Sequence, residues 1–289
     1  VLVIGGGISG IMAAKTAAEN NYKTLLLDEK PHLGGTTIYQ SSEFNKINNQ
    51  YSSKWLENEI SKLKNIKNLE IKTRTSVAAY HGYNFLLARE NLTDHLPLNK
   101  KKDKIRQRLL KIRAKKVIAA TGSIERPLIF NNNDRPGIIL SSAIKKYSDY
   151  YGVVCGKENI LFTNNDSAYE TAISLFNKGI KINAIIDIRE KVNSEITNHA
   201  EKIGIKIYNS YTIVDTSGYR RIKEVSIMKL SKDGQSVTGS KIKIKCNCLG
   251  ISGGWTPAVH LFTQSGGKLK FDNEDNVFIP SKYPSDQIS

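Results

Sequence analysis

The sequence predicts an α/β protein with two three-layer domains, the second inserted into the first. Three observations carry this prediction. The chain opens on an apolar run, residues 1–4, followed by closely spaced glycines and a helix-forming stretch. A second strand–helix–strand pattern begins at Asn159, and an apolar run near the end returns the chain to the first domain. We therefore place the first domain at residues 1–135 plus 255–289 and the second at residues 136–254.

The opening glycines predict a nucleotide site. Gly5, Gly7 and Gly10 stand in G-x-G-x-x-G spacing after a strand and before a helix. In a Rossmann-like domain the first glycine turns the chain, the second admits a pyrophosphate and the third lets helix and strand pack closely. Ile8 and Ser9 complete the turn, where free N–H groups at the helix start face the phosphates. The alternative is a glycine-rich turn that holds no ligand.

An acid after the second strand supports a dinucleotide. The apolar run at residues 24–27 ends in Asp28, 18 residues past Gly10. A spacing of about 20 residues is expected for the acid that binds a ribose 2′-hydroxyl. Glu29 and Lys30 follow Asp28 and belong to the same predicted site. A carboxylate at this point repels a 2′-phosphate, so the pattern favours NAD or FAD over NADP.

Two loops and a strand are predicted to complete the site. A glycine-containing loop after the acid is expected to run close to the nucleotide, and one backbone amide farther on is placed against an adenine edge. Residues 116–120 predict a buried strand that closes on A-T-G, the second signature of flavoproteins with two dinucleotide-binding domains. The residues concerned are Gly35, Thr36, Val77, Ala120, Thr121 and Gly122.

The stretch between these signatures predicts a helix and an antiparallel meander. Ser52 or Ser53 is expected to cap a helix whose apolar face contains Trp55, Leu56, Ile60 and Leu63. The basic cluster KKKDKIRQRLLKIRAKK is interpreted as a solvated β-hairpin. The strands expected in the meander lie at residues 69–74, 76–80, 83–88 and 105–112.

The second strand–helix–strand unit has lost the glycine pattern. Asn164, Asp166 and Tyr169 stand where the first unit has its three glycines. An aspartate about 4 Å from a phosphate charge opposes binding by roughly 4 kcal/mol at a dielectric constant of about 20, which is about a thousandfold in affinity. The unit is therefore interpreted as a structural duplicate that binds no dinucleotide, and Asp187 as a plain strand-end acid.

The rest of the second domain is predicted from apolar periodicity and turn residues. Ser141 or Ser142 is expected to cap a helix that ends at Tyr151, and Asp233 and Gly234 to form a hairpin turn. Residues 249–257 are interpreted as the exit from this domain. The other expected elements are helices at about 167–178, 196–203 and 258–262, and strands at 160–163, 184–187, 205–208, 211–215, 225–230, 242–248 and 269–271.

Composition limits the class of protein. The 289 residues are 39% hydrophobic and contain neither an apolar run of membrane-spanning length nor a signal-peptide pattern at the start. Cys155, Cys246 and Cys248 are interpreted as free thiols in a reducing cytoplasm. The net charge of +16 is spread along the chain, so a nucleic-acid partner is not expected. The five histidines lie far apart, and the sequence predicts neither a catalytic set nor a metal site in this chain.

Five stretches together resemble a known family. They are VLVIGGGISG, DEKPHLGGT, RAKKVIAATGSIERPLIFNNNDRPG, FTNNDSAYETA and SGGWTPAVHLFTQSGGKL. The chain resembles the alpha subunits of heterotetrameric sarcosine oxidases. Opine oxidase and hydrogen cyanide synthase subunits are near alternatives.

The resemblance implies a role that the residues alone do not give. It implies a complex with beta, gamma and delta subunits that oxidises sarcosine to glycine, makes hydrogen peroxide and passes the methyl carbon to tetrahydrofolate. It also implies NAD in the glycine-rich domain of this subunit, FAD in the beta subunit and FMN at a partner-subunit interface. The small N-terminal domain and the folate-binding half of that family have no counterpart here, so the sequence is interpreted as a fragment.

Other functions stay open at this point. A self-contained FAD-dependent NAD(P)H oxidoreductase requires a second working nucleotide site, which the second unit opposes. A non-catalytic scaffold, whose nucleotide only stabilises the fold, differs from an oxidase subunit through its partners.

Overall fold

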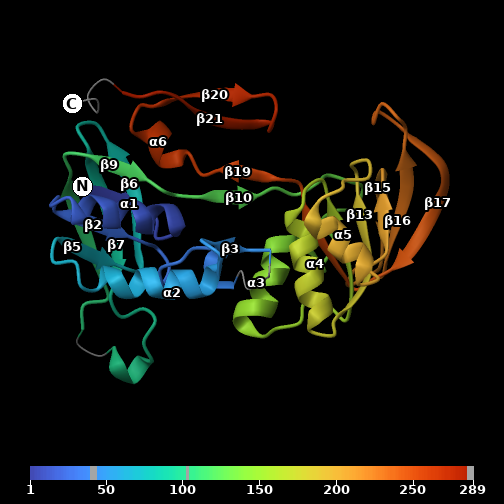
Figure 1. The fold of residues 1–289 in the computed structure, drawn as a ribbon, viewed down its shortest axis with the longest axis horizontal. Helices are drawn as coiled ribbons and strands as arrows, with labels where there is room; N and C mark the ends of the chain where they lie inside the picture. Colours follow the sequence, from blue (N-terminus) through green and yellow to red (C-terminus); the bar gives the residue numbers. More distant parts are fainter. Residues whose placement is uncertain (40–43, 102–103, 285–289) are drawn as a thin grey trace. The chain divides into compact units, whose positions relative to one another are not determined.

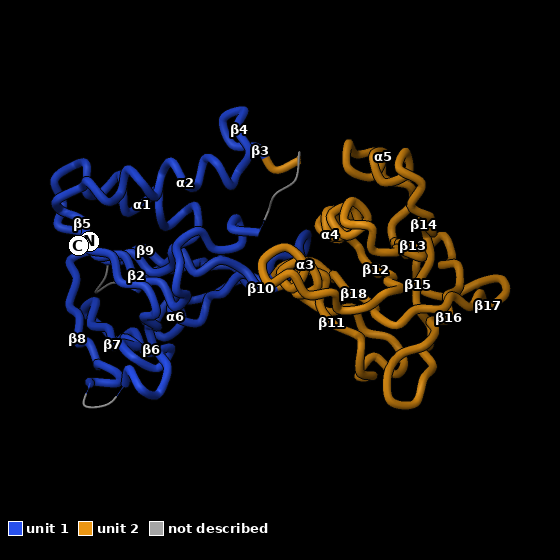
Figure 2. The backbone as a smooth tube through the Cα atoms, turned by 90° about the horizontal axis from the view of Figure 1, so that it is seen from below, with its two compact units in different colours: residues 1–40, 46–124, 256–289 blue, residues 41–45, 125–255 orange. Residues whose placement is uncertain are grey.

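The computed structural model describes residues 1–39, 44–101 and 104–284. The chain folds into two compact units (Figure 2). Unit 1 comprises residues 1–40, 46–124 and 256–289, and unit 2 comprises residues 41–45 and 125–255. The strands β10 (Ser123–Glu125) and β19 (Trp255–Pro257) pair where the chain passes between the units.

Unit 1 has a parallel sheet with the strand order β5-β2-β1-β9 (Figure 1). The central strand β1 (Leu2–Ile4) pairs with β2 (Thr24–Leu27) on one side and with β9 (Val117–Ala119) on the other. Its side chains alternate between two layers. Val3 packs on the helices, whereas Leu2 and Ile4 pack on an antiparallel meander. The predicted three-layer α/β fold is therefore confirmed for this unit.

Two helices cover one face of this sheet. They are α1 (Ile8–Glu19) and α2 (Ser52–Leu63), and Trp55, Leu56 and Leu63 of α2 are buried as predicted. The predicted serine cap of α2 is wrong. Tyr51 is the N-cap residue, Ser52 is buried inside the first turn, and no described side chain caps this helix.

A buried acid joins these two helices. Glu59 of α2 is 6% exposed and bonds to Lys15 of α1 and to Lys62, with both N–O distances at 2.6 Å. The hydrogen bonds from Lys15 and Lys62 lower the pKa of the Glu59 carboxyl below its ordinary value.

The meander on the other face has three strands. They are β6 (Thr75–His81), β7 (Phe85–Asn91) and β8 (Gln107–Arg113), all antiparallel. The predicted fourth member was wrong, because β5 (Leu69–Lys72) pairs parallel with β2 and extends the main sheet. The basic cluster supplies the exposed strand β8, which forms a hairpin with β7; residues 102 and 103 of the cluster lie outside the described residues.

The strand before the A-T-G sequence was predicted to be buried, and this prediction is wrong. Within the described chain β9 is the last strand of its sheet, and Ile118 is 37% exposed. After β19 the chain adds the helix α6 (His260–Gln264) and a hairpin of β20 (Lys268–Asp272) and β21 (Val277–Lys282) to unit 1. The remaining short elements of this unit are η1 (Thr37–Tyr39), β3 (Lys46–Ile47), β4 (Gln50–Tyr51) and η2 (Leu98–Lys100).

Unit 2 repeats the three-layer plan. Its parallel sheet has the order β11-β18-β12-β13-β14 (Figure 2). An antiparallel sheet of β15, β16 and β17 packs on one face of it. The helices α4 and α5 pack on the other face. The strands are β11 (Ile138–Leu140), β12 (Glu158–Thr163), β13 (Lys181–Asp187), β14 (Ile207–Asn209), β15 (Tyr211–Ser217), β16 (Glu224–Leu230), β17 (Val237–Lys245) and β18 (Cys248–Ser252), and the helices are α3 (Ser141–Tyr151), α4 (Ser167–Asn177) and α5 (Glu195–Lys202).

The start of α3 differs from the prediction. Neither serine caps it with a side chain among the described residues, and Leu140 is the N-cap residue. The backbone N–H of Ser142 instead donates to the Glu125 carboxylate at 2.8 Å. A carboxylate at this point also suits the positive end of the helix.

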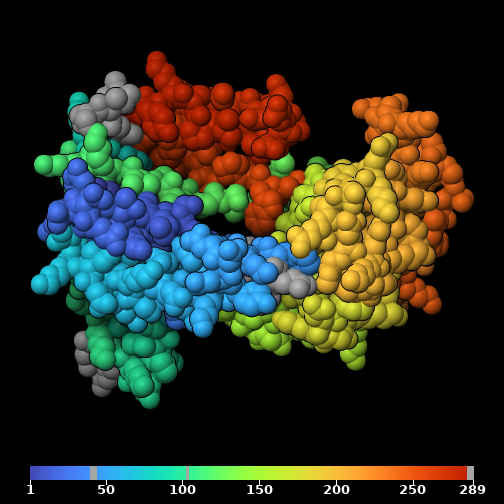
Figure 3. All heavy atoms as spheres, viewed as in Figure 1, coloured from blue at the N-terminus to red at the C-terminus, as the bar shows by residue number. Residues whose placement is uncertain are grey.

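The predicted strand at residues 242–248 is two strands. β17 ends at Lys245 and forms an exposed edge of its sheet (Figure 3, orange), whereas β18 lies inside the parallel sheet. Cys246 and Cys248 are buried free thiols as predicted. Burial raises the pKa of both thiols to about 12.

Candidate dinucleotide site

The turn after β1 presents the start of α1 to the surface of unit 1. β1 ends at Ile4, and Gly7 is the N-cap residue of α1. Among the described residues no side chain caps this helix, and its first turn carries no acid. The backbone N–H groups of Ile8 and Ser9 therefore stay available to an anion at the positive end of the helix.

The three signature glycines differ in what surrounds them. Gly5 has a φ of +104°, and an added Cβ would overlap the Ala120 carbonyl oxygen. A Cβ on Gly10 would overlap the Gly5 carbonyl oxygen, so this glycine lets α1 approach the turn. A Cβ on Gly7 meets no described atom within 4 Å. Gly5 and Gly10 are thus demanded by the fold, while Gly7 keeps open the space that a diphosphate would fill.

Asp28 lies beside the turn but faces the protein. Its Oδ2 accepts the Gly6 N–H at 2.5 Å, its Oδ1 accepts the Lys30 N–H at 2.6 Å, and the residue is 7% exposed. Glu29, the next residue, is exposed. The structure therefore brings the predicted acids to the right strand end, and Glu29 is the one that projects to the surface. The role of either acid in ribose binding stays a prediction.

The loop after Asp28 runs against the glycine turn, and its predicted closeness to a nucleotide stays a prediction. The Gly34 N–H donates to the Gly6 carbonyl oxygen at 2.6 Å. Gly35 has a φ of +59°, and an added Cβ would lie 3.0 Å from the Gly7 Cα. Thr36 follows at the exposed end of this loop.

The A-T-G sequence joins the turn from the other side. The Ala120 N–H donates to the Ile4 carbonyl oxygen at 2.8 Å, and its own carbonyl packs on Gly5. The Thr121 hydroxyl donates to the Ala258 carbonyl oxygen at 2.7 Å. Gly122 has a φ of +73° and, among the described atoms, open space around its Cα hydrogen. The two sequence signatures therefore meet at one turn.

Val77 occupies a different environment. It lies in β6, next to a shift in the register with β7, and its side chain packs on the apolar cluster under the sheet. Its predicted backbone contact with an adenine stays a prediction.

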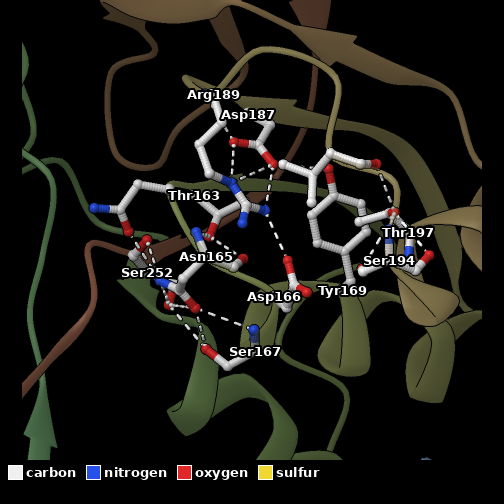
Figure 4. A network of polar contacts seen from close by, with 12 residues as sticks. Thr163, Asn165, Asp166, Ser167, Tyr169, Asp187, Arg189, Ser194, Thr197 and Ser252 are labelled. Carbon is white, nitrogen blue, oxygen red and sulfur yellow. Dashed lines mark hydrogen bonds and ion pairs between the residues drawn. The ribbon is translucent and has the colours of Figure 1, made fainter.

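The equivalent turn of unit 2 is filled by its own side chains (Figure 4). The Asn165 Oδ1 accepts the Ser167 N–H at 3.0 Å, at the start of α4. The Asn165 amide donates in turn to Ser252 of β18, at 3.1 Å to its hydroxyl. A protein side chain thus bonds to a helix N–H group that would otherwise face a phosphate.

The charges beside this turn are paired. Arg189 bonds to Asp187 with its Nη2 2.8 Å from Oδ2, and the same Nη2 lies 2.9 Å from the Asp166 Oδ1. The Tyr169 hydroxyl donates to Asp187 at 2.8 Å, and burial together with that carboxylate raises the Tyr169 pKa well above its ordinary value. Asp166 is therefore not the open negative charge that the sequence suggested. Asp187 is a fully buried member of this network and not a plain strand-end acid.

Two residues of this network were missed from the sequence. Arg189 and Asn165 carry no motif, and only their place directly after a strand could have indicated them. In the described part of the chain, no group of three or more His, Cys, Asp or Glu residues could hold a metal ion. No helix described there has the length and hydropathy needed to traverse a bilayer.

Comparison with known proteins finds a family and several relatives that are similar to this chain in sequence. Residues 1–122 match the family FAD dependent oxidoreductase. The sarcosine oxidase subunit alpha of Corynebacterium sp. (strain P-1) is 32% identical over 289 residues, covering 99% of this chain and 29% of the relative. The corresponding subunit of Rhizobium meliloti (strain 1021) is 29% identical, covering 96% of this chain and 26% of the relative. The chain is a relative of sarcosine oxidase alpha subunits. It spans less than a third of the length of these two alpha subunits.

Solved structures confirm the fold class. The L-proline dehydrogenase of P. horikoshii has a TM-score of 0.69 at 22% identity, covering 97% of this chain and 46% of that one. The thioredoxin reductase of T. acidophilum has a TM-score of 0.68 at 18% identity, covering 96% and 87%. At these identities the likeness concerns the fold alone.

Proposed function

We propose that unit 1 binds a dinucleotide through the turn from Gly5 to Gly10, and that unit 2 binds none. The observation that carries the proposal is the contrast between two helix starts. The start of α1 has uncapped N–H groups and open space at Gly7 within the described structure. At the start of α4 the Ser167 N–H donates to Asn165, and the nearby Arg189 pairs with Asp166 and Asp187.

The residues of unit 1 would hold the ADP half of the nucleotide. The N–H groups of Ile8 and Ser9 would bond to the diphosphate, and Glu29 is exposed at the strand end where a ribose hydroxyl is expected. The dinucleotide itself would supply the redox group. We propose NAD on the strength of the family resemblance; the match to FAD dependent oxidoreductases supports FAD as the second candidate.

The relatives suggest the larger role. We propose that this chain is the nucleotide-holding part of a flavin-dependent sarcosine oxidase with beta, gamma and delta partner subunits. FMN at a partner interface, peroxide formation and transfer of the methyl carbon to tetrahydrofolate belong to the same proposal, as does a cytoplasmic location. A self-contained NAD(P)H oxidoreductase is disfavoured because it needs a second nucleotide at unit 2.

Mass spectrometry of the ligand released from the purified chain tests the nucleotide. We expect NAD. Release of FAD, with its visible flavin spectrum, would show that the site binds the second candidate, FAD, instead of NAD. If the chain releases neither and binds neither on titration, the proposed site is wrong.

A second experiment tests the role in a complex. The tagged chain, isolated from its native cells, is expected to bring down an FAD-bearing subunit and to show sarcosine-dependent formation of hydrogen peroxide. A nucleotide-bound chain that brings down no flavoprotein would instead favour the scaffold.

A further inference from the structure

Gly6, the glycine of the turn that lies outside the signature, is held by neighbouring segments. Both of its backbone groups are bonded to other segments. Its N–H donates to the Asp28 Oδ2 at 2.5 Å, and its carbonyl accepts the Gly34 N–H at 2.6 Å. Gly6 is also buried, unlike Gly7. The turn is therefore tied at Gly6 to the end of β2 and to the loop that follows it.

The bonding partner Asp28 is fixed from several sides. Its second carboxylate oxygen accepts the Lys30 N–H at 2.6 Å. Its backbone N–H donates to the Lys72 carbonyl at 3.0 Å, and its own carbonyl accepts the Thr75 N–H at 2.8 Å. A buried carboxylate needs such partners, because desolvating an unpaired charge is costly. Hydrogen bonds to an ionised acceptor are also roughly twice as strong as neutral ones.

The identity of residue 6 follows from this carboxylate. An added Cβ at Gly6 would lie 2.8 Å from the Asp28 Oδ2 and 2.5 Å from the Leu33 Cδ2. Any side chain at position 6 would therefore push the carboxylate away from the N–H that it binds. Position 6 requires glycine because Asp28 occupies the adjoining space, whereas position 7 is open.

We propose that Asp28 is a positioning residue that holds the glycine turn in its binding shape through Gly6. Bonded to two N–H groups inside the protein, its carboxylate orders the turn instead of binding a ribose. A turn that is ordered before the ligand arrives loses less entropy on binding, which strengthens binding. This inference rests on the proposed dinucleotide site and adds to it the residue that sets its geometry.

Three variants of the full chain test the inference. Asp28→Leu removes both acceptors. Asp28→Asn keeps one oxygen for the Gly6 N–H and loses the charge. Glu59→Gln is the matched control, because Glu59 is an equally buried acid of unit 1 whose partners are Lys15 and Lys62.

The first measurement needs no ligand. In the ¹H–¹⁵N spectrum of the ligand-free chain, the Gly6 amide is expected at low field with slow hydrogen exchange. Asp28→Leu should move it upfield and speed its exchange, and Asp28→Asn should do so less; Glu59→Gln should leave it in place. An unchanged Gly6 amide in both Asp28 variants would overturn the inference.

The second measurement is the dissociation constant for NAD and for FAD, titrated separately. For the dinucleotide that the wild-type chain binds, Asp28→Leu should raise the dissociation constant about tenfold or more. This factor corresponds to the free energy of one charge-assisted hydrogen bond. Asp28→Asn should restore part of the affinity, and Glu59→Gln should bind normally while unfolding more easily. Equal affinity in the wild-type chain and both Asp28 variants would refute the positioning role. A wild-type chain that binds neither dinucleotide would overturn the proposed function, while the Gly6 amide would still show whether the bond exists.

Discussion

Replacing Gly7 by aspartate separates nucleotide binding from folding. Gly7 has a φ of −72° and a ψ of −178°, which any residue can adopt, and an added Cβ meets no described atom within 4 Å. Aspartate is also a better N-cap residue than glycine, by a few tenths of a kcal/mol. We therefore expect Gly7→Asp to fold with wild-type stability or slightly more.

The same substitution places a carboxylate where the diphosphate would lie. Two unit charges about 4 Å apart repel by roughly 4 kcal/mol at an effective dielectric constant of about 20. That energy corresponds to about a thousandfold loss of affinity. Gly7→Asn is the matched control, because asparagine has the same size and capping ability without the charge.

The assay combines thermal unfolding with calorimetric titration of NAD and FAD. We expect both variants to unfold near the wild-type temperature, Gly7→Asn to bind weakly and Gly7→Asp to show no measurable binding. Unchanged binding in Gly7→Asp would refute the site assignment. Equal losses in the two variants would refute the electrostatic argument and leave bulk as the cause.

Three other substitutions probe the fold. Gly10→Ala should destabilise unit 1 strongly, lowering its unfolding temperature, because the new methyl group overlaps the Gly5 carbonyl oxygen. The pKa of Glu59 in the folded protein lies below its ordinary value of 4.5. The stabilisation of the fold by this carboxylate is therefore complete above about pH 4.5 and is lost as the pH falls through the folded pKa. Glu59→Gln should flatten the acid side of the curve of unfolding free energy against pH, measured by urea unfolding. Arg189→Met should cost about 3 kcal/mol or more in the same assay, because it leaves Asp187, which is 0% exposed, without its cation.

The first strand, glycine turn and helix could be predicted from sequence because their signals are local. An apolar strand, spaced glycines and a strand-end acid lie within 28 residues of the start. The direction of a side chain is not a local signal. The sequence placed Asp28 at the right strand end, but its bond to the Gly6 N–H depends on how the turn folds back over β2.

The errors arose where neighbouring elements decide the structure. β9 has an apolar sequence but is exposed, because within the described chain it is the last strand of its sheet. Most of β18 was interpreted as part of the exit from the second domain, residues 249–257. Gly250 instead lies in a buried strand, where a Cβ would come within 2.8 Å of both Leu161 of β12 and Ile144 of α3. Gly250 is therefore explained by the close packing of α3 and β12 on this strand, which is a tertiary feature and not a local signal.

The self-contained network at the start of α4 also limits how unit 2 can evolve. A glycine in place of Asp166 would remove one of the two acids that pair with Arg189. Replacing Arg189 first would leave the buried Asp187 carboxylate without its cation. Asn165 would have to leave the helix start as well, at the expense of its bonds to Ser167 and Ser252. Each single substitution that would open this helix start thus removes contacts of the folded protein before any ligand could compensate for them.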